Sequence, residues 1–394
     1  MAEEKQVPGL NPFRPGSGKS PLHLAGRHQQ IGMLTEQLDA LSSGRSARCA
    51  VVVGANGSGR TSLISDLLTL VDARGWVTSH ADVAIERPAG SLRQSLGRAT
   101  ANAVRSILER RPGSTIAAGL ANAAGAYFPA CAADLGVPAG RETGDLMQDT
   151  LRFVRDLSVA LEEFVGRGLA IVVDDAHGLE TNDLEVLLTV ASTASTRSAQ
   201  VMLLITGSPT IAHHVARLSA VDQIDLVIVG ALDRSEAAEA VTIPASAAGR
   251  RVAAGVPDRI FSVTGGHPYL VQLLSYLAWE AETGSEVSME AVTMASSQLL
   301  DRYDADVLGP GFRPLDGTMR RFVRAVADPS PGLVSTVADV MHRIGTATRF
   351  GRNDGVAEAA HRMLLRSGLV NSPDGVHLFL GDPEARRYAL EMLQ

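Results

Sequence analysis

The sequence predicts an α/β protein in which a parallel sheet covered by helices is followed by a helical lid and a winged-helix domain. Three observations support this fold class. Short, nearly continuous apolar runs alternate with amphipathic segments between residues 28 and 230, a pattern typical of parallel strands buried on both faces. A glycine-rich turn follows the first apolar run. After Leu232 the strand patterns give way to helical periodicity, which continues until one alternating segment near the C-terminus.

The first 232 residues divide into an arm and a domain of alternating strands and helices. Residues 1–21 contain four prolines and scattered glycines, which predicts an extended N-terminal arm. Residues 22–232 form the predicted nucleotide-binding domain. Its expected helices lie at 28–41, 61–71, 91–110, 144–165 and 183–195, and its expected strands at 49–54, 76–83, 169–175, 201–209 and 224–230.

Two smaller domains are expected after this sheet. Residues 233–300 read as a helical lid, with Pro268 in a helix first turn, where its missing N–H is harmless. Residues 301–394 begin with a predicted Gly/Pro-rich loop at 304–317. Three helices and an alternating segment follow, at 318–328, 334–345, 356–370 and 375–383, and this order indicates a winged-helix domain.

Composition limits the class of protein. The chain has 394 residues, of which 45% are hydrophobic and 20% charged, as in soluble globular proteins. The formal net charge of −7 disfavours a globally basic nucleic-acid binder. Cys49 and Cys131 have neither disulfide-framework nor zinc spacing, and the acidic N-terminus has no apolar signal core, so a cytoplasmic protein is expected. Residues 114–133 lack charge, but their Ala and Gly content favours a packed helix over a membrane span.

The glycine-rich turn has the pattern of a phosphate-binding loop. Gly54, Gly57 and Gly59 follow an apolar strand, so consecutive backbone N–H groups can surround phosphates while the next helix directs its positive end toward them. Thr61 is placed to supply a hydroxyl to Mg²⁺. Arg60 occupies the position where such loops carry Lys. The other expected nucleotide contacts in this segment are Asn56, Ser58 and Ser62.

A second acidic motif supports the same site. An apolar strand ends in Asp174 and Asp175, which places Asp174 to hold a magnesium-bound water and Asp175 to orient an attacking water. Thr206 and Ser208 end the next apolar strand, where their hydroxyls either sense a terminal phosphate or only close a turn. The expected cofactors are therefore ATP or ADP and Mg²⁺.

These motifs, in this order, resemble the AAA+ superfamily, in the branch of bacterial ATPases that also holds the origin-recognition and signal-transduction ATPases. The resemblance covers about residues 22–394. It implies an adenine-side box at Gly26 and Arg27 and a lid motif at His267 and Pro268, with Tyr269 where many members carry a phosphate-sensing Arg. The C-terminal "LLRSGLV", followed by an alternating strand, is similar to the winged helix that ends many members.

Three positions depart from the family pattern and shape the functional hypothesis. Arg60 replaces Lys, Asp175 the usual Glu, and His177 the usual amide. A planar guanidinium does not reproduce the point charge of Lys, so we expect nucleotide binding with slow or absent hydrolysis. Because 34 of the 36 basic residues are Arg, Arg60 also fits a chain-wide bias and an ordinary ATPase. The leading function is a nucleotide-dependent switch in which the lid and winged helix relay the nucleotide state to a partner.

Other functions and partners stay open at this stage. A pseudo-ATPase scaffold, a DNA-binding initiator or regulator, and a homo-oligomer remain alternatives, and a protein partner is expected. The third winged-helix helix offers basic groups to DNA, but eleven Arg balance nine Asp or Glu after residue 310. Two features are set aside: "GSGKS" at 16–20 as a decoy phosphate loop, and the pair His213 and His214 as solvated. The possible DNA contacts are Arg349, Arg352, His361, Arg362 and Arg366, and the nearest candidates for a trans-acting finger are Arg217 and Arg234.

Overall fold

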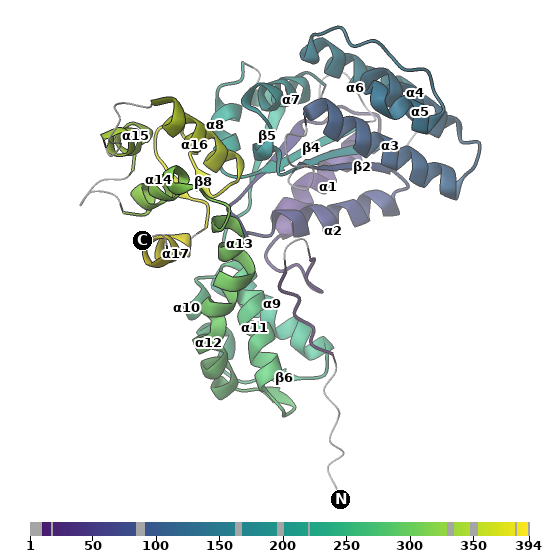
Figure 1. Cartoon of the computed structure of the whole chain (residues 1–394). Helices are drawn as coiled ribbons and strands as arrows, with labels where there is room; N and C mark the ends of the chain where they lie inside the picture. The colour runs from purple at the N-terminus through teal and green to yellow at the C-terminus, as the bar shows by residue number, and fades with distance from the viewer. Residues whose placement is uncertain are drawn as a thin grey trace, which may run out of the picture.

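The computed structural model describes residues 10–16, 19–83, 91–161, 168–194, 201–219, 221–328, 335–346, 354–382 and 384–392. Within these ranges the chain forms a sheet domain, a helical domain that follows it, and a C-terminal module (Figure 1). The described part of the N-terminal arm, from residue 10 on, runs along the helical domain toward the sheet domain (Figure 1).

The sheet has five parallel strands in the order β2-β3-β4-β1-β5. β1, β3 and β4 lie inside the sheet and are buried along their whole length, which explains their nearly continuous apolar sequences. The carboxyl ends of β1, β3 and β4 therefore share one edge, where ligands bind in open α/β sheets. The strands are β1 (Cys49–Val53), β2 (Val77–Asp82), β3 (Leu169–Asp174), β4 (Val201–Gly207) and β5 (Ile224–Ile228).

Helices cover both faces of this sheet and confirm the predicted fold class. On one face, α1 (His28–Ser42) and α2 (Arg60–Ala73) pack their leucines onto Ala50, Val52 and Val172. The other face is covered by α3 (Leu92–Arg110), α4 (Thr115–Tyr127), α6 (Leu146–Leu161), α7 (Thr181–Ala194) and α8 (Thr210–Ala216).

The uncharged stretch at 114–133 packs inside this domain. It forms α4 and the short turn η1 (Pro129–Cys131), which leads into α5 (Ala132–Leu135). A Cβ built on Gly119 would lie 2.7 Å from the Cβ of Ala160, so the small residues let α4 approach α6 closely. Among the described helices, none is long and apolar enough to cross a membrane.

The helical domain contains α9 (Arg234–Ala247), α10 (Val256–Thr264), α11 (Pro268–Ala281) and α12 (Met289–Tyr303). Asp233 and Glu236 form a capping box that fixes the start of α9. The expectation that strands stop after Leu232 is wrong in one detail, because β6 (Arg251–Val252) and β7 (Glu286–Val287) form a short parallel pair. Two residues per strand leave too little alternation for a strand to be predicted.

The C-terminal module, residues 304–392, continues directly from α12. The Gly/Pro-rich segment expected to be a loop instead runs through a π-helical turn, η4 (Asp304–Leu308), into α13 (Gly309–Phe312). Pro310 lies in the first turn of α13, where no N–H is needed. A Cβ on Gly309 would lie 2.8 Å from the Asp304 carbonyl oxygen, so this tight turn requires glycine. The module then has α14 (Gly317–Ala327), α15 (Val337–Thr346), α16 (Asp354–Arg366), the antiparallel pair β8 (Val370–Asn371) and β9 (Phe379–Leu380), and α17 (Ala385–Met392).

Candidate nucleotide-binding site

The loop between β1 and α2 has the geometry of a phosphate-binding loop. Gly57 and Gly59 adopt φ values of 73° and 91°, in the region that favours glycine. A Cβ on Gly54 would lie 2.5 Å from the Val229 carbonyl oxygen, and one on Gly57 would lie 2.5 Å from His267 Cε1. The glycines therefore allow both the turn and the close approach of its neighbours.

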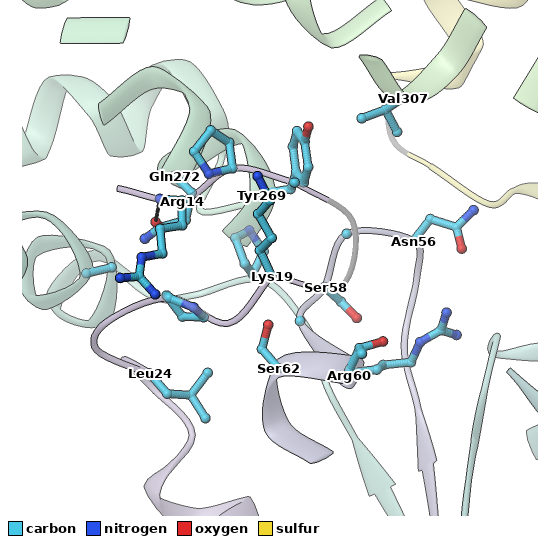
Figure 2. A pocket seen from close by; sticks show the side chains of 18 of the residues that line it. Arg14, Lys19, Leu24, Asn56, Ser58, Arg60, Ser62, Tyr269, Gln272 and Val307 are labelled. Atoms are coloured by element: carbon cyan, nitrogen blue, oxygen red, sulfur yellow. Dashed lines mark hydrogen bonds between the residues drawn. The ribbon is translucent and has the colours of Figure 1, made fainter. Parts of the chain in front are cut away.

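A pocket of about 470 Å³ opens beside this loop. Its walls come from the N-terminal arm, the loop with the first turn of α2, the start of α11, and the turn after α12 (Figure 2). Gly26, Gly54, Asp174 and His267 are not among the residues that line the pocket. The expected site residues that line the pocket are Arg27, Asn56, Gly57, Ser58, Gly59, Arg60, Thr61, Ser62, Asp175 and Pro268.

Arg60 is turned toward the sheet. Its Nη1 donates to the Gly54 carbonyl oxygen at 2.9 Å, and its Nη2 pairs with Asp175 Oδ1 at 3.0 Å. Only 9% of the Arg60 side chain is exposed. In the view of Figure 2 its guanidinium extends away from Lys19. Two of the three residues that depart from the family pattern, Arg60 and Asp175, thus neutralise each other in this conformation.

Asp174 lies at the centre of a group of oxygen atoms. Its carboxylate accepts hydrogen bonds from Thr61 Oγ1 at 3.3 Å, from the Asp175 backbone N–H at 3.0 Å, and from the Thr206 hydroxyl. Burial raises the pKa of Asp174, but hydrogen bonds from His80 and Thr206, with the positive charge of Arg60, outweigh it and hold the pKa below its usual value. The carboxylate is therefore ionised at neutral pH.

This oxygen group fits Mg²⁺. A carboxylate and a threonine hydroxyl are hard oxygen donors, and Mg²⁺ usually combines one or two such ligands with water and substrate phosphates. Within the described ranges, no group of three His, Cys, Asp or Glu side chains forms a complete protein cage. Thr61 and Asp174 would hold the ion, which would supply charge neutralisation to the phosphates.

Asp175 has a strained backbone. Its φ of 53° is the single positive value among the non-glycine residues that the structure describes. Such a conformation costs about 1 kcal/mol or more and often marks functional sites. Asp175 Oδ1 also lies 3.7 Å from His177 Nδ1, which accepts a hydrogen bond from the Ser208 backbone N–H at 3.3 Å. His177 thus links the ends of β3 and β4, as an amide side chain at this position also could.

Arg27 holds the loop from behind. Its Nη2 donates to the carbonyl oxygens of Ser58 at 3.0 Å and Gly230 at 2.5 Å. Burial lowers the pKa of Arg27, and the charge of Glu236 opposes this shift. The neighbouring Gly26 has a φ of 68°, and a Cβ there would lie 2.5 Å from Glu236 Cδ. The predicted adenine-side box therefore also connects the loop to the domain that follows.

The start of α11 contacts the outer side of the loop. His267 Nε2 lies 3.0 Å from the Asn56 carbonyl oxygen, and the Tyr269 backbone N–H donates to the Gly57 carbonyl oxygen at 3.3 Å. His267 also caps α11 through its Nδ1, which accepts from the Leu270 N–H. Pro268 and Tyr269 line the pocket, and burial raises the pKa of the Tyr269 hydroxyl.

The C-terminal module contacts the same loop, which the sequence does not reveal. The Asn56 N–H donates to the Gly381 carbonyl oxygen at 3.1 Å, and Asn56 Nδ2 donates to the Gly368 carbonyl oxygen at 3.3 Å. Ser372 N–H donates to Thr210 Oγ1 at 3.0 Å on α8. Among the described residues, Asn56 is therefore the loop residue whose hydrogen bonds join the loop to both the helical domain and the C-terminal module.

The arm also contributes to the site, although the sequence interpretation set its "GSGKS" segment aside. Arg14, Lys19 and His23 line the pocket. The sequence did contain a sign that the arm packs against the protein, because Phe13 is a large apolar residue among polar residues and prolines. It is buried edge-on against the Trp279 ring, with centroids 6.1 Å apart, and this contact fixes the arm on the helical domain.

The basic residues considered for DNA have other contacts. Arg366 donates from Nε to the Gly178 carbonyl oxygen at 3.0 Å and pairs with Glu180, and His361 stacks on Phe322. Arg362 pairs with Glu358 in its own helix. Arg349 and Arg352 lie outside the described residues.

The two candidates for a trans-acting finger and the histidine pair of α8 also lie outside the pocket lining. Arg217 is exposed, and Arg234 pairs with Asp258. His213 lies against Gly375 of the C-terminal module, since a Cβ on that glycine would be 2.4 Å from its ring. The expectation that His213 is simply solvated is therefore wrong, because the module covers this part of α8.

Comparison with known families identifies the domain that carries the pocket. Residues 23–205 match the family model of the AAA ATPase domain. This stretch, slightly less than half of the chain, is therefore similar to the AAA ATPase domain. The predicted AAA+ resemblance is thus confirmed, and the nucleotide-binding class of the protein follows from it. No curated protein matches the chain.

Two solved structures are similar to this chain over most of their length. A Walker-type ATPase of Pyrococcus abyssi is similar over 96% of this chain and 98% of its own, with 13% identity and a TM-score of 0.57. The ORC1 protein of Aeropyrum pernix, solved in complex with DNA, is similar over 94% and 93%, with 12% identity and a TM-score of 0.47. At such identities the likeness to the Pyrococcus protein shows the fold alone.

Proposed function

We propose that this AAA ATPase-domain protein is a nucleotide-dependent switch that binds Mg-ATP and hydrolyses it slowly. The observation that carries the proposal is the ion pair between Arg60 and Asp175. One partner stands where the loop lysine is expected, and the other where a water-orienting carboxylate is expected. While they pair, neither acts on phosphate or water, and their pairing must be broken before hydrolysis.

Nucleotide binding rests on the groups that are kept. The loop, the start of α2, Thr61 and the ionised Asp174 supply backbone N–H groups, a helix N-terminus and magnesium ligands. The expected loss is in rate rather than in binding, because removing one preorganised donor from a reacting centre typically costs about 10²–10³ in rate.

The relay to a partner rests on Asn56. Its N–H and side chain bond to the C-terminal module and its carbonyl oxygen to His267, so a loop that rearranges around phosphate changes contacts in both. We propose a protein partner for this module, which we interpret as a winged helix, because Arg366 and His361 of its third helix are engaged within the chain. A cytoplasmic location, a bacterial source and homo-oligomer formation stay predictions of the sequence.

The test combines binding and turnover. Mg-ATP is titrated calorimetrically into nucleotide-free protein, and the cell contents are then assayed for ADP. We expect micromolar binding with little ADP, and we expect Arg60→Lys to raise the turnover rate at least about tenfold, since a Lys restores the point charge. Arg45→Lys, at an exposed position outside the site, is the matched control and should change nothing.

Two outcomes would overturn the proposal of a nucleotide-dependent switch. If the wild-type protein hydrolyses several ATP per second and Arg60→Ala abolishes this activity, the protein is an ordinary ATPase. No heat at millimolar ATP would favour the second candidate, a pseudo-ATPase scaffold. The same Arg60 and Asp175 ion pair supports that candidate, because it neutralises the charge of Arg60 without any nucleotide.

A further inference from the structure

The N-terminal arm crosses from the helical domain to the sheet domain along the mouth of the pocket. Asn11 Nδ2 donates to the Tyr276 carbonyl oxygen at 3.2 Å and to Glu280 Oε1 at 2.7 Å. Phe13 is 3% exposed beside Trp279, and the Arg14 backbone N–H donates to Gln272 Oε1 at 3.2 Å. These contacts hold the arm on α11, and Arg14, Pro15 and Gly16, which follow Phe13, line the pocket.

This arrangement brings a lysine to the nucleotide pocket. The sequence has two lysines, Lys5 and Lys19, and Lys19 lines the pocket. Figure 2 draws Lys19 between Arg14 on one side and Ser58 and Ser62 on the other. The side chain is exposed and folds over Gly16, where a Cβ would lie 3.0 Å from Lys19 Cδ. Its flexible stem leaves the ammonium group free to turn toward a ligand.

The charges of the pocket favour Lys19 over the other cations. Four lysine or arginine residues line it, but Arg60 is paired with Asp175 and Arg27 is occupied by the carbonyl oxygens of Ser58 and Gly230. Within the described ranges, no ion pair is formed by Arg14 or Lys19. A polyphosphate entering this pocket therefore meets two cations without a partner carboxylate, and both come from the arm.

We propose that Lys19 binds the phosphate chain of the nucleotide and supplies the ammonium charge that the loop lacks. The inference deepens the proposed function and rests on it, since it assigns a ligand contact within the same pocket. A compact ammonium with three donors suits phosphate oxygens, and such charge-assisted bonds are about twice as strong as neutral ones. Lys19 is a binding residue in this role; the hydroxyl of Thr61 and the carboxylate of Asp174 keep the magnesium.

The first experiment uses the scarcity of lysine. Full-length protein is treated briefly with an amine-acylating reagent, with and without ligand, and modification of Lys19 and Lys5 is measured by mass spectrometry. We expect saturating Mg-ATP to slow acylation of Lys19 by about tenfold. Phosphate oxygens would bind the protonated amine, and only the neutral amine attacks the reagent. Lys5 is the internal reference and should react equally in every sample. Adenosine, which has no phosphate, should leave Lys19 unprotected.

The second experiment measures affinity. We expect Lys19→Gln to weaken Mg-ATP binding by about tenfold, the value of one charge-assisted contact, and to leave adenosine binding within about twofold. Lys19→Arg should retain most of the affinity for Mg-ATP. Lys5→Gln makes the same change of net charge at the second lysine of the sequence and should behave as wild type.

The outcomes separate this inference from the proposed function. If wild-type protein binds Mg-ATP but Lys19 is neither protected nor sensitive to substitution, the Lys19 assignment is wrong and the switch stands. Equal losses of ATP and adenosine affinity in Lys19→Gln would show that Lys19 only shapes the arm, which also overturns the assignment. If wild-type protein binds no nucleotide, both proposals fail.

Discussion

The phosphate-binding loop has an inner and an outer face, and the two are built differently. The inner face meets the sheet, where Thr61, Asp174 and Thr206 bring their oxygen atoms together at the ends of neighbouring elements. The outer face meets other domains, where Asn56 and Gly57 bond to residues more than 200 positions away.

This difference suggests that the inner face acts in nucleotide binding and the outer face in positioning the C-terminal module. The inner face carries Thr61 and Asp174, the magnesium ligands that we propose. The outer contacts described above use backbone groups of the loop or the short side chain of Asn56, so they respond to the loop's conformation rather than to its charge. A change at the inner face should therefore act on nucleotide binding, and a change at the outer face on the position of the C-terminal module.

The largest effect is expected from breaking the inner face. Asp174→Asn keeps the size of the side chain but removes the charge that holds Mg²⁺, so we expect turnover to fall about 10²-fold. Nucleotide binding, measured by calorimetry with and without Mg²⁺, should lose its dependence on the metal. Asp134→Asn removes an exposed carboxylate and serves as the control. Unchanged metal dependence in Asp174→Asn would show that the ion is held elsewhere.

The inner face was also the part that the sequence predicted well. Continuous apolar strands and local motifs fix which residues end at one sheet edge, because parallel strands bring their carboxyl ends together. Thr61 and Asp174 are therefore neighbours in the structure although 113 positions separate them in the chain. The direction of the Arg60 side chain was not predictable, since it depends on the left-handed backbone that aims Asp175 at it.

The outer face was missed because its contacts depend on how domains dock. Gly368 and Gly381 have no periodicity or motif that pairs them with Asn56, and their backbone carbonyl groups carry no side-chain signal. Lys19 was set aside because no strand precedes its glycines, which is correct for a phosphate loop but does not exclude a pocket wall. The helical turn at 304–312 was also missed, because Gly and Pro there were taken as loop formers.

A smaller effect is expected from loosening the outer face. Arg366→Gln removes the bond to the Gly178 carbonyl oxygen and the pair with Glu180, so the docked state should lose about 1–2 kcal/mol. Hydrogen exchange of the backbone N–H groups of Asn56 and Ser372, which bond across this interface, should become faster.

Arg362→Gln is the matched control for this prediction. Arg362 lies on the same helix but pairs within it, with Glu358, and is well exposed. If both variants exchange at the wild-type rate, the bonds of Arg366 do not hold the module. If Arg366→Gln also changes nucleotide affinity while the metal dependence stays intact, the two faces are coupled as the switch requires.

The smallest effect concerns the interior of the C-terminal module. Burial lowers the pKa of His361, the charge of Arg362 lowers it further, and Glu358 partly opposes this. The ring stacks on Phe322, and its buried Nε2 has no hydrogen-bond partner among the described residues. The folded module therefore favours the neutral ring, whereas the unfolded chain takes up the proton near pH 6.5.

The sign of the pH dependence follows from that difference. The stability contributed by neutral His361 is complete above about pH 6.5 and is lost as the pH falls below it, because only the unfolded chain gains a proton readily. Thermal unfolding between pH 7.5 and 5.5 should thus show a decline that is shallower in His361→Gln, by at most about 1.4 kcal/mol per pH unit. His214, whose pKa is also lowered by burial, leaves a residual slope in that variant. An identical slope in wild type and His361→Gln would mean that the ring is protonated in the folded module, and its stacking on Phe322 would then have to tolerate a charge.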